Sequence, residues 1–322
     1  MEKKFNVFAT RRLHKSALDK IRKTCNLRVH LGKIPIPRDI LLKNIKNIDG
    51  LICHPYDKIN SDILKNAHRL RAISTFSVGF DHIDVKFAKS KKIQIGYTPE
   101  VLTNATAELT IGLIIDLLRR MSESDRIIRK KQWNEIFGAY DYTGTEIAGK
   151  TLGIIGMGRI GKDVASKAIG LGMKISYHNR KRITKNDEKK LNAKFLSFDK
   201  LIQESNVISI HVPYSKETHH LINSKIFKKM KKTSFFINTS RGKIVDEVAL
   251  INALKKKEIQ GAGIDVFESE PIAKNSPLLK LENVVLSPHI GSSTQETRKK
   301  MSEITAENLL NGLQGKKLLY SV

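Results

Sequence analysis

Residues 151–161 read TLGIIGMGRIG, an apolar run followed by three spaced glycines and then by helical spacing over residues 162–169. In the pattern G-x-G-x-x-G each glycine has its own role. Gly156 permits a tight turn, Gly158 lets a pyrophosphate approach the backbone, and Gly161 lets helix and strand pack closely. The N-terminus of the helix then faces the anion. Glycine turns are common, but the place of this one between an apolar strand and a helix predicts dinucleotide binding. The residues predicted to contact the cofactor here are Gly156, Gly158, Arg159, Ile160 and Gly161.

Short apolar runs alternate with helical or charged stretches along most of the chain. They lie at residues 5–9, 50–53, 70–74, 93–96, 152–155, 174–177, 207–211, 234–238, 261–266 and 284–287. The later runs are spaced by roughly 20 to 30 residues, which leaves room for one helix between neighbouring strands. The alternation predicts an α/β protein with two doubly wound, parallel, Rossmann-like sheets. The length of 322 residues also favours two lobes, because one core seldom organises more than about 200 residues.

Helix signals predict how the lobes are connected. Residues 97–99, Tyr-Thr-Pro, break the strand pattern, and Thr103 or Asn104 can cap a long helix. Its apolar face runs through Leu109, Leu113, Leu117 and Met121. Residues 294–313 also have helical spacing, and we expect this helix to pack on the first lobe. Residues 122–150 have no clean period, which favours a docking arm at a subunit contact. The aromatic residues of this arm are Trp133, Phe137, Tyr140 and Tyr142.

Composition and charge exclude several classes of protein. A hydrophobic fraction of 40% with 28% charged residues is typical of globular proteins and argues against long disorder or a fibrous repeat. The net charge of +26 attracts small anionic substrates as well as polyanions, but the lysines are spread along the chain rather than gathered in one patch. We therefore interpret them as a solvated surface and expect no specific nucleic-acid partner.

No membrane segment, metal site or disulfide is predicted. Residues 1–10 hold no apolar stretch long enough for a secretory signal, and Asp116 interrupts the densest apolar segment, residues 109–118. Cys25 and Cys53 are too few for a metal-ligand set, and their apolar neighbours are typical of reduced, buried thiols. We expect no membrane contact, no bound metal and a cytoplasmic location.

The turn after residues 174–177 bears on the choice of cofactor. In an NAD site, an acidic residue about 20 positions after the glycines accepts hydrogen bonds from the ribose 2′-hydroxyl. Here the residues that follow are His178, Asn179, Arg180, Lys181 and Arg182. A guanidinium can hold a 2′-phosphate that a carboxylate would repel, so the three cations favour NADPH, with Arg180 as the first contact. The alternative interpretation is a solvated basic turn in a lysine-rich protein, which leaves NAD open as the cofactor.

Arg241, Glu270 and His289 each come shortly after one of the predicted strands of the later lobe. The carboxyl ends of parallel strands gather at one edge of a doubly wound sheet, where a dinucleotide also binds. We therefore expect these three side chains to meet beside the nicotinamide, although each of them taken alone is more typical of a structural or surface residue.

Together these three residues suit the reduction of a 2-keto acid by a nicotinamide cofactor. The reaction needs a hydride, a proton for the developing alkoxide and a cation for the carboxylate. His289 can supply the proton, and the carboxylate of Glu270 favours a charged imidazolium. Arg241 offers two parallel donors that can hold the carboxylate and polarise the carbonyl. The pattern predicts an NAD(P)-dependent reductase with His289, Glu270 and Arg241 as its catalytic set.

Taken together, these segments resemble the D-isomer-specific 2-hydroxyacid dehydrogenase family, over about residues 50–315. The matching segments are residues 153–161, 238–242, 263–271 and 287–292. Within the family, residues 73–82 and 96–103 resemble the glyoxylate/hydroxypyruvate reductase branch. The arm at residues 122–150 does not match closely, which leaves the selection of substrate size open.

The resemblance implies a substrate-binding domain made of residues 1–102 and 290–322, and an NAD(P)-binding Rossmann domain made of residues 103–289. It also implies a cleft between the two domains and a homodimer. Further cofactor-lining positions that the family implies are Thr106, Pro213, Thr239, Asp265 and Gly291.

The resemblance also implies a role for each site residue. His289 is the proton donor, Glu270 tunes it, and Arg241 binds the substrate carboxylate. Backbone amides of Val78 and Gly79 complete that anion site, since a glycine turn can aim two N–H groups at one carboxylate. With the NADPH preference that the basic turn after Tyr177 favours, the predicted activity is NADPH-preferring reduction of glyoxylate to glycolate and of hydroxypyruvate to D-glycerate. Two alternatives stay open: reduction of larger acids such as 2-ketogluconate, and a dinucleotide-sensing corepressor that resembles the C-terminal-binding-protein branch.

Overall fold

The computed structural model describes residues 4–322 and divides the chain into two compact units. The first unit comprises Met1–Leu102 and Ser292–Val322, and the second comprises Thr103–Gly291. The chain re-enters the first unit at Ser292, two residues later than predicted. The reason is that the backbone amides of Ile290 and Gly291 donate hydrogen bonds to Asp265 of the second unit.

The first unit is built around a five-stranded sheet of order β2-β1-β3-β4-β5, in which every pair is parallel. The strands are β1 (Phe5–Ala9), β2 (Cys25–Val29), β3 (Gly50–Cys53), β4 (Ala72–Thr75) and β5 (Gln94–Gly96). The helices are α1 (Lys15–Thr24), α2 (Arg38–Ile45), α3 (Ser61–Leu64), α4 (Val85–Ser90) and α12 (Gln295–Leu313). The connections leave the neighbours β1 and β3 in opposite directions, as in a doubly wound sheet.

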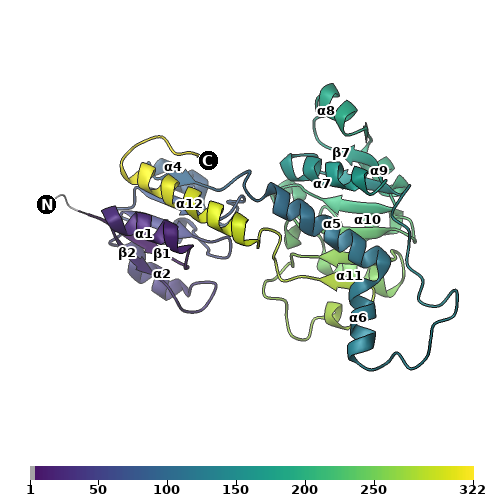
Figure 1. Cartoon of the computed structure of the whole chain (residues 1–322). Coiled ribbons are helices and arrows are strands. Elements are labelled where there is room, and N and C mark those ends of the chain that lie inside the picture. The colour runs from purple at the N-terminus through teal and green to yellow at the C-terminus, as the bar shows by residue number, and fades with distance from the viewer. Residues whose placement is uncertain (1–3) are drawn as a thin grey trace. The chain divides into compact units, whose positions relative to one another are not determined.

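Helices cover both faces of this sheet. On one face lie α1 and α12, which pack against each other (Figure 1). Glycines allow the close approach of α12: a Cβ at Gly312 would lie 2.7 Å from the Cβ of Ala72, and one at Gly50 would lie 3.0 Å from a methyl group of Leu309. The last helix therefore packs on the first lobe, as predicted. The core of the other face includes Phe8, Leu41, Ile45, Leu51, Ile63 and Ile73.

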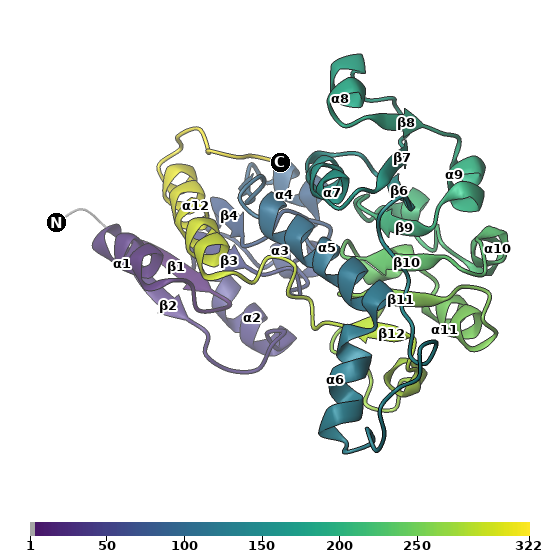
Figure 2. The same cartoon turned by 45° about the vertical axis from the view of Figure 1, so that its right-hand side comes forward.

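The second unit is built around a seven-stranded parallel sheet of order β12-β11-β10-β9-β6-β7-β8 (Figure 2). Its strands are β6 (Thr151–Ile155), β7 (Lys174–His178), β8 (Ala193–Phe195), β9 (Val207–Ile210), β10 (Phe235–Asn238), β11 (Gly261–Ile264) and β12 (Val284–Leu286). Its α-helices are α5 (Thr103–Arg119), α6 (Met121–Arg129), α7 (Arg159–Gly170), α8 (Lys185–Lys190), α9 (Phe198–Glu204), α10 (Ser224–Lys229) and α11 (Glu247–Lys255). Short 3₁₀ turns are η1 (Lys216–Thr218), η2 (Gly242–Ile244) and η3 (Pro277–Lys280).

Both faces of the seven-stranded sheet are buried, so successive residues of a strand enter different cores. Ile154 packs with α5 and α7 on one face, whereas Ile155 packs with α9, α10 and α11 on the other. In β10, Phe235 and Ile237 join the first core and Phe236 joins the second. This two-sided burial explains the continuous apolar runs in the sequence. The predicted class, α/β with two doubly wound parallel sheets, is confirmed.

Four elements differ from the prediction. Strands β2 and β8 lie at sheet edges and are largely solvated, so their sequences lack the apolar run that marks a central strand. The helix predicted to run through Met121 ends at Arg119, because Arg120 adopts a left-handed conformation with a φ of 56°. A separate helix, α6, then follows in the stretch that is predicted to lack regular structure.

Two predictions from composition can be compared with the structure. Cys25 and Cys53 are free and buried, and burial raises the pKa of both thiols, as expected for inert structural cysteines. No helix within residues 4–322 is both long enough and apolar enough to cross a bilayer.

Candidate active site

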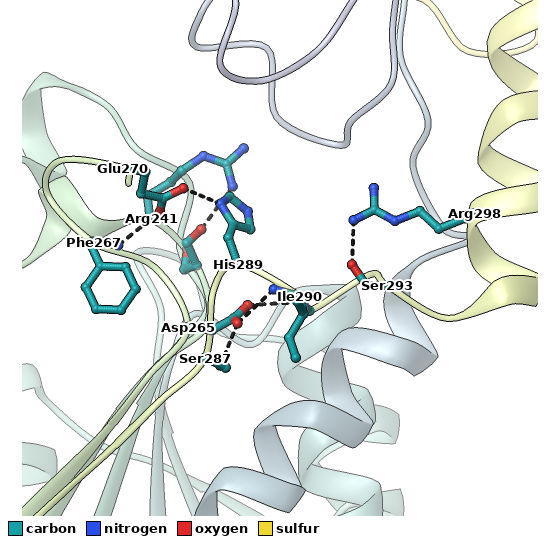
Figure 3. A network of polar contacts seen from close by, with 11 residues as sticks. Arg241, Asp265, Phe267, Glu270, Ser287, His289, Ile290, Ser293 and Arg298 are labelled. Atoms are coloured by element: carbon teal, nitrogen blue, oxygen red, sulfur yellow. Dashed lines mark hydrogen bonds and ion pairs between the residues drawn. The ribbon is translucent and has the colours of Figure 1, made fainter. Parts of the chain in front are cut away.

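Arg241, Glu270 and His289 follow three neighbouring strands of the second unit. They come shortly after β10, β11 and β12 respectively, and these strands are adjacent in the sheet. Figure 3 shows the three side chains next to one another, at the ends of these strands. The parallel topology therefore brings together the three residues that we predict to form a catalytic set.

His289 and Glu270 form a tightly held pair. Atom Nδ1 of His289 lies 2.7 Å from Oε2 of Glu270 (Figure 3). The other carboxylate oxygen of Glu270, Oε1, accepts a hydrogen bond of 3.0 Å from the backbone amide of Phe267. The side chains of His289 and Glu270 are 24% and 16% exposed, so the pair is partly shielded from water.

Asp265 anchors the loop that carries His289. Its buried carboxylate accepts hydrogen bonds from the Ser287 hydroxyl at 2.6 Å, the Ile290 amide at 2.8 Å and the Gly291 amide at 2.9 Å. The amide of His289 donates to the Asp265 carbonyl at 2.8 Å. Burial raises the pKa of Asp265, and the hydrogen bonds oppose that rise because they favour the carboxylate. These contacts hold His289 at a φ of 54°, a left-handed conformation that is uncommon outside glycine.

Asn238, the last residue of β10, fixes the turn that carries Arg241. Its side chain accepts a hydrogen bond from the Ser240 amide and donates one to the Arg241 carbonyl, both at 3.0 Å. The guanidinium of Arg241 donates to the Ser240 carbonyl at 2.9 Å. A Cβ at Gly242 would lie 1.9 Å from the carbonyl carbon of Phe267, so only glycine lets this turn pack on the loop after β11. Sequence reasoning missed the roles of both Asn238 and Gly242.

The glycine turn between β6 and α7 has the shape that its spacing predicts. Gly156 has a φ of 100°, and a Cβ there would lie 2.6 Å from the carbonyl group of His211. A Cβ at Gly161 would lie 2.2 Å from the carbonyl oxygen of Gly156, so this glycine lets the helix approach the turn. A Cβ at Gly158, in contrast, would meet nothing within 4 Å. This open space at the N-terminus of α7 fits a pyrophosphate that approaches the backbone.

Asn179, directly after β7, is another contact that sequence reasoning missed. Its Oδ1 accepts a hydrogen bond of 2.7 Å from the amide of Met157, inside the glycine turn. An NAD site would have an acid near this position, whereas here a neutral side chain holds the turn. The signal for this contact in the sequence is a polar residue, Asn179, directly after the strand that neighbours β6.

The three cations after Asn179 have different surroundings. Arg180 and Lys181 are exposed. The guanidinium of Arg182 forms a two-pronged ion pair with Glu188, at 2.6 and 2.8 Å, and therefore points to α8. Of the three residues that we predict to hold a 2′-phosphate, Arg182 is already engaged by a carboxylate, and a phosphate contact from Arg180 or Lys181 stays a prediction.

The other predicted cofactor positions of the second unit lie near the carboxyl ends of its strands. Thr239 follows β10 directly, and its hydroxyl lies 2.9 Å from that of Thr110. Thr106 packs near Gly291, since a Cβ at that glycine would lie 3.5 Å from Cγ2 of Thr106. Pro213 follows β9. These positions suit contacts along an extended dinucleotide. That these residues contact the cofactor stays a prediction.

Val78 and Gly79 belong to the first unit, where they follow β4 and are half-buried. The neighbouring Ser77 holds this turn: its hydroxyl donates to the Gly79 carbonyl at 2.5 Å and lies 2.8 Å from the hydroxyl of Thr75. The role of the two backbone amides as donors to a carboxylate stays a prediction.

The histidine that packs against the glycine turn should make the protein sensitive to acid. Burial lowers the pKa of His211 to about 3, so the folded protein binds a proton there only near pH 3, whereas the unfolded chain does so near pH 6.5. Stability is therefore lost as the pH falls from 6.5 towards 3. Between pH 7 and pH 5 we expect the wild type to lose about 2 kcal/mol more unfolding free energy than His211→Gln, whose amide can keep the contact to Ser209. Urea unfolding at both pH values measures this difference, and equal losses would contradict a buried neutral histidine.

Comparison with known proteins covers both units. Residues 111–291 match the family model described as D-isomer specific 2-hydroxyacid dehydrogenase, NAD binding domain. A glyoxylate reductase of Thermofilum pendens is 45% identical over 310 residues, which make up 96% of this chain and 91% of that protein.

Solved structures match over nearly the whole chain as well. A protein of Thermus thermophilus has a TM-score of 0.92 and 38% identity, with 98% of this chain and 99% of that chain covered. The NADPH-dependent glyoxylate/hydroxypyruvate reductase of Sinorhizobium meliloti, in complex with NADP and malonate, has a TM-score of 0.86 and 26% identity, with 99% and 97% covered. The matched sequence contains the glycine turn and the Arg241, Glu270 and His289 set. The chain therefore belongs to the D-isomer specific 2-hydroxyacid dehydrogenase family.

Proposed function

We propose that this protein is an NADPH-preferring reductase of small 2-keto acids, which converts glyoxylate to glycolate and hydroxypyruvate to D-glycerate. The observation that carries the proposal is the 2.7 Å contact of His289 with Glu270, next to Arg241, in the unit that also holds the glycine turn. The Thermofilum pendens glyoxylate reductase, 45% identical along almost the whole chain, supports the choice of substrate.

In this proposal the protein's side chains bind, orient and protonate the substrate. The reduced nicotinamide supplies the hydride. Arg241 holds the substrate carboxylate and polarises the keto group, with the amides of Val78 and Gly79 as further donors. Because Glu270 holds Nδ1 of His289, Nε2 is the ring atom that passes a proton to the developing alkoxide. The carbonyl carbon thus gains the hydride and its oxygen gains the proton.

The preference for NADPH rests on the loop after β7. The residue that directly follows the strand is Asn179, which has no charge to repel a 2′-phosphate and is engaged by the glycine turn. Arg180 and Lys181 come next and are exposed. Two cations beside a neutral residue suit a 2′-phosphate better than a 2′-hydroxyl.

Replacing Arg180 and Lys181 together by Ala is expected to raise KM for NADPH by about 10- to 100-fold and to change KM for NADH little, because hydrogen bonds to charged groups contribute about 1.5 to 3 kcal/mol. Initial rates with each nicotinamide at saturating glyoxylate measure both constants. Lys189→Ala is the control, because it removes a charge from exposed α8 instead. An equal rise of both KM values, or a wild type that prefers NADH tenfold, would overturn the assignment.

A panel of keto acids tests the substrate class. With NADPH we expect the highest kcat/KM for glyoxylate and hydroxypyruvate, and a lower value for 2-ketogluconate. A higher value for the larger acid would replace the proposal by 2-ketoaldonate reduction.

We also propose that two chains form a homodimer through α6 and the residues that follow it. This region exposes the large apolar side chains of Met121, Ile128, Trp133, Ile136, Phe137 and Tyr140. Several large apolar side chains exposed along one segment are typical of a protein–protein contact. Light scattering should give the mass of two chains for the wild type and of one chain for Ile136→Lys, whose parent side chain is 89% exposed. A monomeric wild type would contradict the proposal.

A further inference from the structure

Basic and aromatic side chains meet at the carboxyl edge of the first unit's sheet. Arg11 follows β1, His54 and Tyr56 follow β3, and Phe76 follows β4. Because the connections leave β1 and β3 in opposite directions, the space beyond their carboxyl ends is where doubly wound sheets bind ligands. All residues of this edge belong to the first unit, whereas Arg241, Glu270 and His289 belong to the second.

Three rings form a platform under two guanidinium groups. The ring of His54 stacks on Tyr56 at 5.3 Å and on Phe76 at 5.8 Å between centroids. The Cζ atom of Arg11 lies 5.5 Å from the centroid of Tyr56, and that of Arg298, from the first turn of α12, lies 5.4 Å from the centroid of Phe76. Stacking on aromatic faces leaves the donor edges of a guanidinium to other partners. We call these five residues the Arg11–Arg298 cluster.

Neither arginine of the cluster is neutralised by an ion pair. Within residues 4–322, no carboxylate oxygen lies within 4 Å of either guanidinium, and Nη2 of Arg11 is buried without a hydrogen-bond partner. Arg298 donates one hydrogen bond, of 2.7 Å, to the hydroxyl of Ser293 (Figure 3). Asp57 attracts Arg11 from farther away, but its carboxylate already accepts hydrogen bonds from the Thr10 hydroxyl and the His54 amide.

The electrostatics of the cluster favour an added negative charge. Burial lowers the pKa of both arginines, and the charge of Arg11 lowers that of Arg298 further. Two partly desolvated like charges and an unmet donor are costly for the folded protein unless an anion joins them. A carboxylate or phosphate supplies several acceptor oxygens for the donor edges of two guanidiniums.

The place of the cluster in the chain links it to the substrate. The guanidinium of Arg298 lies over the ring of Phe76, and Phe76 is two residues before Val78 in the sequence. We propose that Arg11 and Arg298 bind a second anionic group at the far end of a 2-keto acid whose own carboxylate is held by the turn of Val78 and Gly79. This inference rests on the proposed function, and it adds 2-keto acids with a terminal carboxylate or phosphate to the substrates of the enzyme.

Matched substrates test the inference. The first pair is 2-ketoglutarate and 2-ketovalerate, which have equal chain length and differ in the terminal carboxylate. The second pair is 3-phosphohydroxypyruvate and hydroxypyruvate, which differ in the phosphate. For each pair we take the ratio of kcat/KM for the dianionic acid to that for the monoanionic acid, with NADPH. In Arg298→Gln and in Arg11→Gln this ratio should fall about 10- to 100-fold in at least one pair, and the pair affected shows which oxyanion the cluster takes.

Lys299→Gln is the control, because it removes a charge from the exposed face of α12 and should leave the ratio unchanged. Ratios unchanged in both arginine variants would overturn the inference. An equal loss for both members of each pair would overturn it too, because the arginines would then act on the carboxylate that all substrates share. Glyoxylate reduction by the wild type distinguishes failure of this inference from failure of the proposed function. If either negative result is found and the wild type reduces glyoxylate, only the inference fails. If the wild type does not reduce glyoxylate, the proposed function fails as well.

Discussion

Replacing His289 by Asn is expected to lower kcat for glyoxylate reduction by about 10²- to 10⁴-fold, with KM changed little, because a positioned proton donor acts mainly in the transition state. Asn removes the proton donor but suits the site otherwise. It tolerates the left-handed backbone that His289 adopts, with a φ of 54°, better than most residues do. Its amide can also keep a hydrogen bond to Glu270, so the loop anchored by Asp265 should stay in place.

A second histidine–glutamate pair provides a matched control. Nε2 of His220 lies 2.9 Å from Oε1 of Glu268, also in the second unit, and His220 has a φ of 49°. His220→Asn therefore makes the same chemical change on the same kind of backbone, outside the proposed site. We expect its kcat to stay near the wild-type value. Similar losses in both variants would show that removal of a paired histidine disturbs the unit as a whole, and would contradict His289 as the proton donor.

The proximity of Arg241, Glu270 and His289 could be predicted because two independent patterns agree. Apolar runs mark the central strands, since both faces of the sheet are buried, as Ile154 and Ile155 show by entering different cores. The parallel topology then brings the residues after β10, β11 and β12 to one edge. The residue types at these strand ends indicate the chemistry, although the distances between them come from the structure.

Contacts that depend on three-dimensional packing could not be predicted. Nothing in the sequence around Gly242 shows that the loop after β11 passes within van der Waals distance of it. The pairing of Arg182 with Glu188 is equally hidden, because a basic residue in a basic turn looks the same whether it meets a carboxylate or a phosphate. The edge strands β2 and β8 escape prediction for a simpler reason, because strands that stay solvated carry no apolar run.

Replacing Arg241 by Gln is expected to lower kcat/KM for glyoxylate by about 10³-fold. Part of the loss is the charge-assisted contact to the substrate carboxylate, of about 1.5 to 3 kcal/mol, and the rest is the lost polarisation of the keto group in the transition state. The contact to the carboxylate already forms when the substrate binds, so we expect its loss to raise KM. The polarisation of the keto group acts in the transition state, so we expect its loss to lower kcat. This combination distinguishes Arg241 from His289, whose replacement should act on kcat.

Arg241→Lys separates charge from geometry. An ammonium keeps the positive charge but cannot offer two parallel donors, so we expect it to recover part of the binding and little of the rate. Lys243→Gln is the control: it removes a neighbouring exposed charge from the same turn and leaves intact the Asn238 contacts that fix it. If Lys243→Gln lost as much kcat/KM as Arg241→Gln, general attraction of anions by a basic surface would explain the effect. If Arg241→Lys were as active as the wild type, the two-donor contact would be unnecessary and Arg241 would act as a point charge alone.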